Sequence, residues 1–504
     1  MTMPSHDQAV PTQQVERVVI AGGGTAGWMA AAAISKLIGR KLDIALVESD
    51  QIPTVGVGEA TIPTILTINR LLQIPEPEFL KAVQGTFKLG IEFENWRRRG
   101  HSYIHSFGDT GRGCWAAGFH HFWLKGLRQG VSSDYGDYCA ELKAAEQGKF
   151  ALLSRHKLNY AYHLDAGLYA AYLRKIAEQH GVRRVEGKIA EVRCNAASGY
   201  IESLQLESGQ TIGGDLFIDC TGFRGLLIEQ TLKTGFEDWS HWLPCNSALA
   251  VQTESVGPPI PYTRSIARGA GWQWRIPLQH RVGNGLVYCS DYMSDDEAAQ
   301  VLLGNVEGKC ITDPRPIKYC TGQRKQYWNK NCIALGLASG FIEPLESTSI
   351  HFIQNGLMWL LLMFPHQGIN RSVVEQYNAT LQREAHHIRD FIVLHYHVTE
   401  RDDTEFWNYC RNMSIPDSLA HRLELFRESG RVFKPQDDVF AENSWIQVMM
   451  GQGMTPEQYH PIVDMMDDGE LRSFLRDIED NVNKLVAQLP AHGDFVNLYC
   501  NAGK

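Results

Sequence analysis

A glycine-rich turn near the start of the chain constrains the fold more than any other feature of the sequence. A valine-rich segment at 15–20 precedes the turn, and an alanine-rich segment at 28–38 follows it. Between them, Gly22, Gly24 and Gly27 have the spacing G-x-G-x-x-G. The first glycine permits a tight turn, the second lets a pyrophosphate approach the backbone, and the third lets the helix pack close to the strand. The sequence therefore predicts an α/β fold that begins with a dinucleotide-binding strand, turn and helix.

The flanks of this unit supply further contacts to such a ligand. Thr25 and Ala26 lie in the turn just before the predicted helix, where free backbone N–H groups and the helix dipole favour phosphate. The next strand, predicted over 42–47, ends at Glu48, about 20 residues after the last glycine of the motif. An acidic residue at this distance can hydrogen-bond a ribose hydroxyl group.

A further glycine loop follows at 55–63. The later segments 215–225 and 331–340 each place an apolar strand before a glycine-containing turn, and we expect them to close the same site, since ligands of open α/β sheets bind where strands end in such turns. The residues assigned to the ligand here are Gly58, Ala60, Gly222, Leu335 and Gly336. The sequence contains no second complete dinucleotide motif.

Composition excludes several other classes of protein. The chain has 504 residues, 44% of them hydrophobic, which is enough for a large core. Its net charge of −9 argues against nucleic acid as a partner. The polar segment 1–14 and the short apolar run 357–364 predict no signal peptide and no membrane span, so we expect a cytoplasmic protein. The eleven cysteines include no C-x-x-C pair, which favours free thiols and predicts no metal site.

Lys88 and Glu346 are the candidate catalytic residues. Lys88 lies among apolar residues, where a partly desolvated amine can act inside a cavity, although a surface lysine with a buried stem is the simpler alternative. Glu346 precedes a predicted apolar helix whose N-terminus suits a small anion, and we expect Ser347 or Thr348 to cap it. The positive end of the helix would lower the pKa of Glu346, making it a charged partner or a base; the alternative is a solvated or capping glutamate.

Trp272 and Trp274 alternate along a predicted strand in the segment 271–277. Alternate residues share one face of a strand, so the two indoles can form a broad, rigid surface that excludes water. A pair of core aromatic residues is the alternative interpretation.

Taken together, these segments resemble the flavin-dependent halogenases typified by the tryptophan halogenases, over most of the chain. The paired marks are Gly22-x-Gly24-x-x-Gly27 and Trp272-x-Trp274-x-Ile276-Pro277. Supporting segments are Gly56-Val-Gly58-Glu-Ala-Thr-Ile-Pro63, Asp219-Cys-Thr-Gly222-Phe-Arg-Gly225 and Glu343-Pro-Leu-Glu346-Ser347-Thr348. The resemblance implies a Rossmann-type FAD-binding fold like that of flavin monooxygenases. It also implies a module at 15–365 with the halide and catalytic site and insertions around 95–165, and a mostly helical substrate module at 366–504.

By this resemblance, reduced FAD, oxygen and halide give hypohalous acid, which passes through an internal tunnel to Lys88. Lys88 holds the oxidant by hydrogen bonding or as a haloamine, and Glu346 polarises it or takes the ring proton. The remaining implied roles are flavin binding by Ser347, halide binding by Thr348 and Ser349, a substrate pocket with His105, Phe107 and Trp445, and a partition between flavin and substrate made by Trp272, Trp274, Ile276 and Pro277.

The chain departs from the tryptophan halogenases at two places. Ser349 stands where they carry glycine, so halide preference is open, and bromide is favoured because it is easier to oxidise. The segment 440–453 replaces the Tyr-Tyr and Glu cluster that grips the amino-acid end of free tryptophan. An indole without that end, a larger indole or phenol, or a peptide is therefore the expected substrate.

The family also implies a separate flavin reductase that supplies FADH2, and a homodimer. Two other functions compete with halogenation. A flavin-dependent aromatic hydroxylase would need access of its substrate to the flavin and would not need Lys88. A non-catalytic FAD-binding protein would leave both Lys88 and Glu346 without a role.

Overall fold

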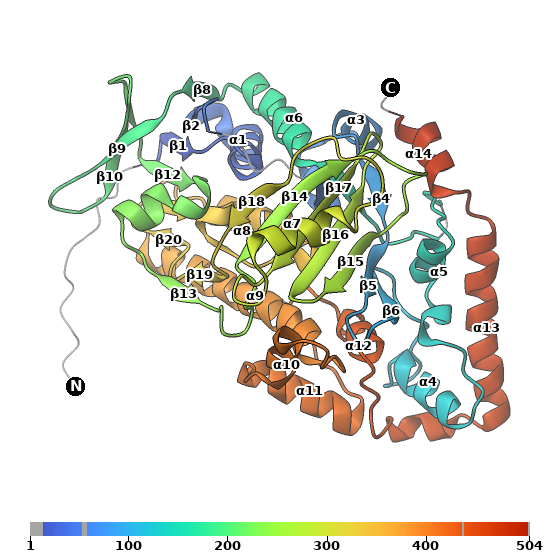
Figure 1. The fold of residues 1–504 in the computed structure, drawn as a ribbon. Helices are drawn as coiled ribbons and strands as arrows, with labels where there is room; N and C mark the ends of the chain where they lie inside the picture. The colour runs from blue at the N-terminus through green and yellow to red at the C-terminus, as the bar shows by residue number, and fades with distance from the viewer. Residues whose placement is uncertain (1–13, 53–57, 155, 436–437, 502–504) are drawn as a thin grey trace, which may run out of the picture.

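A six-stranded sheet, mostly parallel, contains the strand that leads into the glycine turn (Figure 1). The computed structural model describes residues 14–52, 58–154, 156–435 and 438–501. In sheet order the strands are β20 (Trp328–Asn329), β21 (Cys332–Ala334), β12 (Leu216–Asp219), β1 (Arg17–Ala21), β2 (Asp43–Glu48) and β8 (Arg183–Glu186). Only β20 runs antiparallel to its neighbour. The central strand β1 is buried from Val18 to Ala21, as expected for a strand covered on both faces.

Helix α1 (Thr25–Leu37) follows β1 and packs against α6 (Ala166–Gln179). Its four successive alanines, 30–33, are fully buried, and these small side chains allow close helix packing. The helix begins three residues before the predicted segment and ends one residue before its end, an ordinary boundary difference.

A seven-stranded sheet forms the second large layer. Its order is β18 (Arg315–Lys318), β14 (Ser247–Thr253), β17 (Val282–Tyr288), β16 (Gly271–Pro277), β15 (Thr263–Arg268), β5 (Gly90–Glu94) and β6 (Ser102–Ser106). All pairs are antiparallel except β15 with β5. Strand β16 carries the predicted tryptophan pair and lies in the middle of this sheet, and every one of its residues except Arg275 is buried.

Three small sheets complete the strands of the described chain. One consists of β3 (Gly58–Ala60), β7 (Ala161–Asp165) and β4 (Thr86–Lys88), and it fixes the position of Lys88. The others are β11 (Thr211–Gly213), β10 (Ile201–Leu206) and β9 (Ile189–Cys194), and β13 (Phe236–Asp238), β19 (Gly322–Arg324) and β22 (Gly340–Phe341). Of the glycine loop predicted at 55–63, residues 55–57 lie outside the described residues.

Helices cover the sheets and dominate the C-terminal part. The remaining ones before residue 365 are α2 (Ile65–Leu71), α3 (Glu76–Ala82), α4 (Phe119–Arg128), α5 (Ala140–Glu146), α7 (Asp295–Leu303) and α8 (Ser349–Leu362). After it come α9 (Arg371–His397), α10 (Glu405–Asn412), α11 (Asp417–Ser429), α12 (Glu442–Gly451), α13 (Asp468–Ala487) and α14 (His492–Cys500). None of the helices in the described ranges is long and apolar enough to span a membrane.

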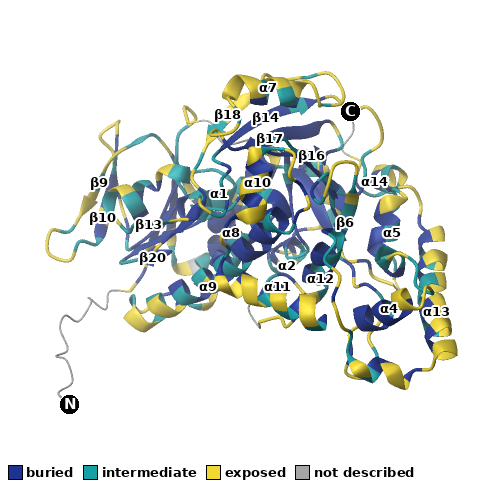
Figure 2. Ribbon diagram, turned by 60° about the horizontal axis from the view of Figure 1, so that its bottom comes forward, coloured by how far each residue is buried: buried dark blue, intermediate teal, exposed yellow. Residues whose placement is uncertain are grey.

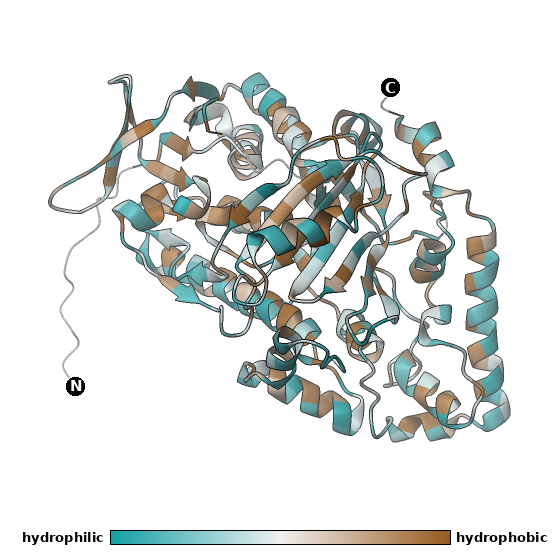
Figure 3. Cartoon of the chain, viewed as in Figure 1, coloured by the Kyte–Doolittle hydropathy of each residue, from teal (hydrophilic) through white to brown (hydrophobic). Residues whose placement is uncertain are grey.

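The N- and C-terminal parts share their cores. The first half of α9 packs into the core around α1 and α8, and its second half packs into the core behind β16. Helix α13 covers α4 and α5 along one side of the molecule, with an exposed hydrophilic outer face (Figures 2 and 3). The division into modules at residue 365 stays a prediction, and the packing of α9 shows how tightly the two parts are joined.

Candidate active site

The glycine turn leaves room for a ligand at one position and none at the others. A Cβ on Gly22, whose φ is +106°, would lie 2.3 Å from the Cys220 carbonyl oxygen, and one on Gly27 would lie 1.8 Å from the Gly22 carbonyl oxygen. A Cβ on Gly24 would meet nothing within 4 Å. Gly24 is also the N-cap of α1, and no side chain caps that helix. The turn therefore fits the phosphates of a dinucleotide, which would accept hydrogen bonds from the helix N-terminus.

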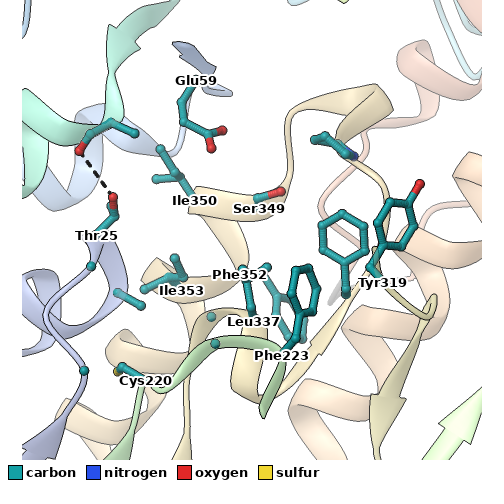
Figure 4. A pocket seen from close by; sticks show the side chains of 18 of the residues that line it. Thr25, Glu59, Cys220, Phe223, Tyr319, Leu337, Ser349, Ile350, Phe352 and Ile353 are labelled. Carbon is teal, nitrogen blue, oxygen red and sulfur yellow. Dashed lines mark hydrogen bonds between the residues drawn. The ribbon is translucent and has the colours of Figure 1, made fainter. Parts of the chain in front are cut away.

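A cavity of about 550 Å³ extends from this turn to the start of α8 (Figure 4). We call it the large cavity; its size suits a cofactor. It is lined by most of the residues predicted to hold flavin or halide or to form the partition, namely Gly22, Gly24, Thr25, Ala26, Glu48, Gly58, Ala60, Gly222, Trp272, Trp274, Ile276, Gly336, Ser347, Thr348 and Ser349. Gly27, Pro277 and Leu335 do not line it.

Glu48 lies at the edge of the large cavity beside the glycine turn. Its carboxylate accepts hydrogen bonds from Arg184 Nε at 2.6 Å and from the Trp28 indole at 3.3 Å. These donors fix the carboxylate where the sequence predicts an acceptor for a ribose hydroxyl group.

Trp272 and Trp274 form one wall of the large cavity. Their ring centroids are 6.2 Å apart, and the planes are inclined by 59°. The indole of Trp272 donates a hydrogen bond of 2.6 Å to Glu343, which also accepts one of 2.6 Å from the Tyr396 hydroxyl group. Burial raises the pKa of Glu343 to about 7, against the effect of these two donors. Glu343 thus fixes the orientation of the Trp272 ring, a role that the sequence analysis missed.

Lys88 is fully buried at the end of β4. Its ammonium donates hydrogen bonds to Ser347 Oγ at 2.8 Å and to the Thr61 carbonyl oxygen at 3.1 Å, and it lies 5.1 Å from the centre of the Phe107 ring. Burial lowers the pKa of Lys88 to about 7, and the charge of Glu346 opposes part of that shift. Lys88 is therefore a desolvated amine, and the alternative of a surface lysine is wrong.

Glu346 is buried on the single-turn helix η6 (Pro344–Glu346) between two histidines. Both carboxylate oxygens face His105 Nδ1, at 2.9 and 3.0 Å, and Oε1 also lies 2.9 Å from His395 Nε2. Burial by itself would raise the pKa of Glu346, but the charge and hydrogen bond of His105 and the interaction with His395 outweigh it, and the pKa falls to about 2. We call Lys88, His105, Glu346 and His395 the buried polar cluster.

The turn between η6 and α8 joins the buried polar cluster to the large cavity. Ser347 adopts the left-handed conformation, with a φ of +60°, and it both lines the cavity and accepts the hydrogen bond from Lys88. The prediction that Ser347 or Thr348 caps α8 is wrong: Thr348 is the N-cap residue but makes no side-chain capping bond, and the Ser347 hydroxyl group is held by Lys88. The N–H groups that open α8 therefore remain available to an anion in the cavity.

The predicted substrate residues lie on β6, after it, and on α12. His105, which was predicted to line the substrate pocket, also hydrogen-bonds Glu346. Phe107 lies beside Lys88. Trp445 is fully buried, with the Arg422 guanidinium 3.8 Å from its ring centre and Phe391 packed edge-on at 4.7 Å. The structure thus brings His105 and Phe107 to the two candidate catalytic residues and places Trp445 in the aromatic packing around Phe391.

His395 and Glu59 are further site residues that the sequence analysis missed. His395 lies on α9, 49 positions from Glu346, and nothing in its local sequence marks it. Glu59 points into the large cavity in Figure 4, and burial raises its pKa to about 7. Only the adjacent Gly58 and Ala60 were assigned from sequence. Within the described ranges, no three His, Cys, Asp or Glu side chains are grouped for metal binding.

Comparison with known proteins agrees with this site. The family model for tryptophan halogenase matches residues 17–468. The tryptophan 6-halogenase SttH of Streptomyces toxytricini is 34% identical over 520 aligned residues, covering 96% of this chain and 98% of that protein. Two solved structures described as flavin-dependent halogenases are also similar. Xcc4156 of Xanthomonas campestris is 59% identical with a TM-score of 0.96, and BrvH of Brevundimonas sp. BAL3 is 42% identical with a TM-score of 0.93; each comparison covers 97% of this chain and 99% of the other.

A Rossmann-type glycine turn, a large cavity and a buried amine define an enzyme of the dinucleotide-binding α/β class. The chain belongs to the tryptophan halogenase family. It is a flavin-dependent halogenase, an oxidoreductase that uses FADH2 and halide. The predicted family, fold class, enzyme class and cofactors are thereby confirmed. Members of the family typically need a separate flavin reductase and an aromatic substrate.

Proposed function

We propose that this protein halogenates an indole-like aromatic compound that lacks the amino-acid end of free tryptophan. The observation that carries the proposal is the position of Ser347, which lines the large cavity and holds Lys88 in the buried polar cluster. An oxidant made in the cavity would thus reach the amine past a single residue. Either bromide or chloride serves as halide, and we expect bromide to be preferred because it is easier to oxidise.

The large cavity provides the flavin and halide sites of this proposal. When bound, reduced flavin converts oxygen and halide into hypohalous acid. The glycine turn binds the phosphates through backbone N–H groups, and Thr348 and Ser349 hold the halide at the uncapped start of α8. Trp272 and Trp274 exclude water and keep the organic substrate away from the flavin, which disfavours direct hydroxylation.

Lys88 and Glu346 carry the transfer to the ring. Lys88 Nζ has two acceptors, Ser347 and Thr61, so its third proton can bond the oxygen of hypohalous acid. The carboxylate of Glu346 supplies negative charge that stabilises the cationic ring formed when the halogen adds. Because both groups are shielded from water, these interactions are stronger than they would be at the surface.

The substrate class follows from the aromatic packing around Phe391. Phe440 stacks on Phe391 with ring centroids 3.8 Å apart, and Trp445 lies on another side of Phe391. Such surroundings suit a flat aromatic ring, and the nearby Arg422 guanidinium is already paired with Asp438. SttH is named a tryptophan halogenase, whereas Xcc4156 and BrvH, which are more similar to this chain, are described without a named substrate.

We further propose that a separate flavin reductase supplies FADH2, that the protein forms a homodimer, and that it works in the cytoplasm. Eleven free cysteines favour a reducing compartment. The partner and the assembly are inferred from the family alone.

Product analysis by mass spectrometry tests the proposal. The protein is incubated with FAD, a flavin reductase, NADH, oxygen and bromide, together with indole, a set of substituted indoles and phenols, or free tryptophan. A bromine isotope doublet is expected on indole or a related ring, with less product from free tryptophan. A gain of one oxygen without halogen would support the hydroxylase instead, and efficient bromination of free tryptophan would contradict the proposed substrate class.

A further inference from the structure

One ring nitrogen of His105 makes no hydrogen bond to the described residues around it. Its Nδ1 donates to the Glu346 carboxylate at 2.9 Å, and the side chain is only 2% exposed. The other nitrogen, Nε2, is buried and has no hydrogen-bond partner among the described residues. A buried polar atom without a partner is costly in a folded protein and is often kept for a ligand or for chemistry.

Glu346, by contrast, is a poor proton acceptor. His395 Nδ1 lies 2.7 Å from the Phe391 carbonyl oxygen and its Nε2 lies 2.9 Å from Glu346, so both nitrogens face acceptors. The interactions with His105, and after them those with His395, outweigh the effect of burial and lower the pKa of Glu346 to about 2. A carboxylate so strongly stabilised in its charged form has little tendency to take a proton.

We propose that His105 Nε2 accepts the proton that leaves the aromatic ring, while Glu346 orients His105 and stabilises the imidazolium that forms. This inference rests on the proposed function. The arrangement is that of a carboxylate and histidine acting together, in which the carboxylate fixes the tautomer at Nδ1 and leaves Nε2 free as the base. Glu346 is then a positioning residue, and His105 is a catalytic residue.

The step balances with Lys88 as the second proton carrier. A ring electron pair forms the carbon–halogen bond as the halogen–oxygen bond of hypohalous acid breaks, and the departing hydroxide takes a proton from the Lys88 ammonium to leave as water. The carbon–hydrogen electron pair then restores aromaticity, and the released proton moves to His105 Nε2. Return of that proton to Lys88 after the product leaves completes the cycle, and the net reaction converts hypohalous acid and the arene into the haloarene and water.

The positions of the neighbouring groups support this assignment. The His105 ring lies edge-on to Phe391 at 5.6 Å and 6.5 Å from Phe440, among the aromatic rings proposed to receive the substrate. Phe107, two residues further along the same segment, contacts Lys88. The halogen donor and the proton acceptor are thus linked through the short segment 105–107, which keeps them near each other, as an addition followed by proton loss requires.

Deuterated substrate tests the role of His105. Bromination of indole and of fully ring-deuterated indole is compared for the wild type, His105→Asn and His105→Phe. Asparagine can keep a donor toward Glu346 but has no atom at the Nε2 position, whereas phenylalanine keeps the ring volume alone. The wild type should brominate both indoles at the same rate, because proton loss follows a slower addition. Both variants should be slower by about 10²–10⁴-fold, the usual value of a general base, and should now discriminate against deuterium.

A second measurement separates this inference from the proposed function. Hypohalous acid released without substrate is captured by a small-molecule trap, and its rate should stay within about twofold of the wild type in both variants. Variants that keep most of their bromination rate, or lose it without discriminating against deuterium, would overturn the role of His105. No brominated indole from the wild type itself would overturn the proposed function and this inference together.

Discussion

The large cavity and the buried polar cluster share one turn but are built in opposite ways. The cavity is open, and its ligand sites are largely backbone groups at the glycine turn and at the start of α8. The cluster contains four ionisable side chains that lie almost entirely out of solvent and are held by paired charges and hydrogen bonds. Ser347 lines the cavity and bonds Lys88 of the cluster.

This contrast relates each region to its task. Backbone N–H groups can bind a large, anionic cofactor without committing a charge of the protein, so the ligand can be exchanged at low cost. A desolvated amine beside a paired carboxylate costs stability whether or not substrate is present, but it is already organised when the oxidant arrives. Substitutions in the large cavity should therefore affect cofactor binding. Substitutions in the buried polar cluster should affect the transfer of halogen to the aromatic ring.

The largest expected effect concerns Glu346. Glu346→Gln should reduce bromination of indole by about 10²–10⁴-fold, because the neutral amide does not stabilise positive charge on His105 or on the ring. FAD affinity and trapped hypohalous acid should remain near their wild-type values, since the large cavity is untouched. Loss of FAD binding along with bromination would show that the two regions are not separable.

A change in stability should accompany removal of the buried amine. In the unfolded chain Lys88 keeps its proton up to a pKa of about 10.4, whereas in the folded protein it loses it near pH 7. Between these values the unfolded chain binds more protons, so this term makes stability rise with pH. Lys88→Met should therefore be more stable than the wild type at pH 7, on the order of 4 kcal/mol.

Urea unfolding of both proteins across pH 7 to 10.5 measures this difference, which should shrink toward zero at the alkaline end. A difference that does not change with pH would mean that Lys88 is not desolvated. The same variant should not brominate indole. The buried amine of Lys88 would then lower the stability of the fold but be required for activity.

A smaller effect is expected from Gly24→Ala, made in the cavity. The added methyl group meets no protein atom, so the melting temperature without FAD should not change. It would occupy space beside the phosphates, and FAD affinity should fall by about tenfold, or roughly 1.4 kcal/mol. Gly257→Ala is the matched control, since its Cβ is equally free and lies away from the large cavity. Equal FAD affinity in the two variants would argue against phosphate binding at this turn.

The smallest predicted change is at Ser349, which lines the large cavity and begins α8. Ser349→Gly should alter the ratio of chloride to bromide oxidation by a few-fold without affecting FAD affinity, because only the backbone at the proposed halide site is relaxed. Hypohalous acid trapping with each halide measures the ratio. An unchanged ratio would remove Ser349 from the halide site.

Local features of the sequence were the most predictable. The glycine turn, α1 and the tryptophan strand depend on residues close together in the chain, and their spacing determines their geometry. The capping of α8 was predicted wrongly because the Ser347 hydroxyl group is bound by Lys88, which is 259 positions away.

The hydrogen-bond partners of the catalytic residues could not be predicted from the sequence either, because they too are far apart in the chain. His105 and Glu346 are 241 positions apart, and the bond between Trp272 and Glu343 joins different elements. The resemblance to halogenases indicated which lysine and glutamate matter, but only the packing of α9 brings His395 to Glu346. The individual site roles stay predictions until variants are measured.

The most direct test of the account is to measure both halves of the reaction in Lys88→Ala. Trapped hypohalous acid and brominated indole are quantified in parallel for the variant and the wild type, with FAD affinity as a control for folding. The account predicts that the variant still oxidises bromide and binds FAD but gives no brominated indole. Bromination at the wild-type rate in the absence of Lys88 would contradict the claim that the oxidant made in the cavity is delivered through the buried polar cluster.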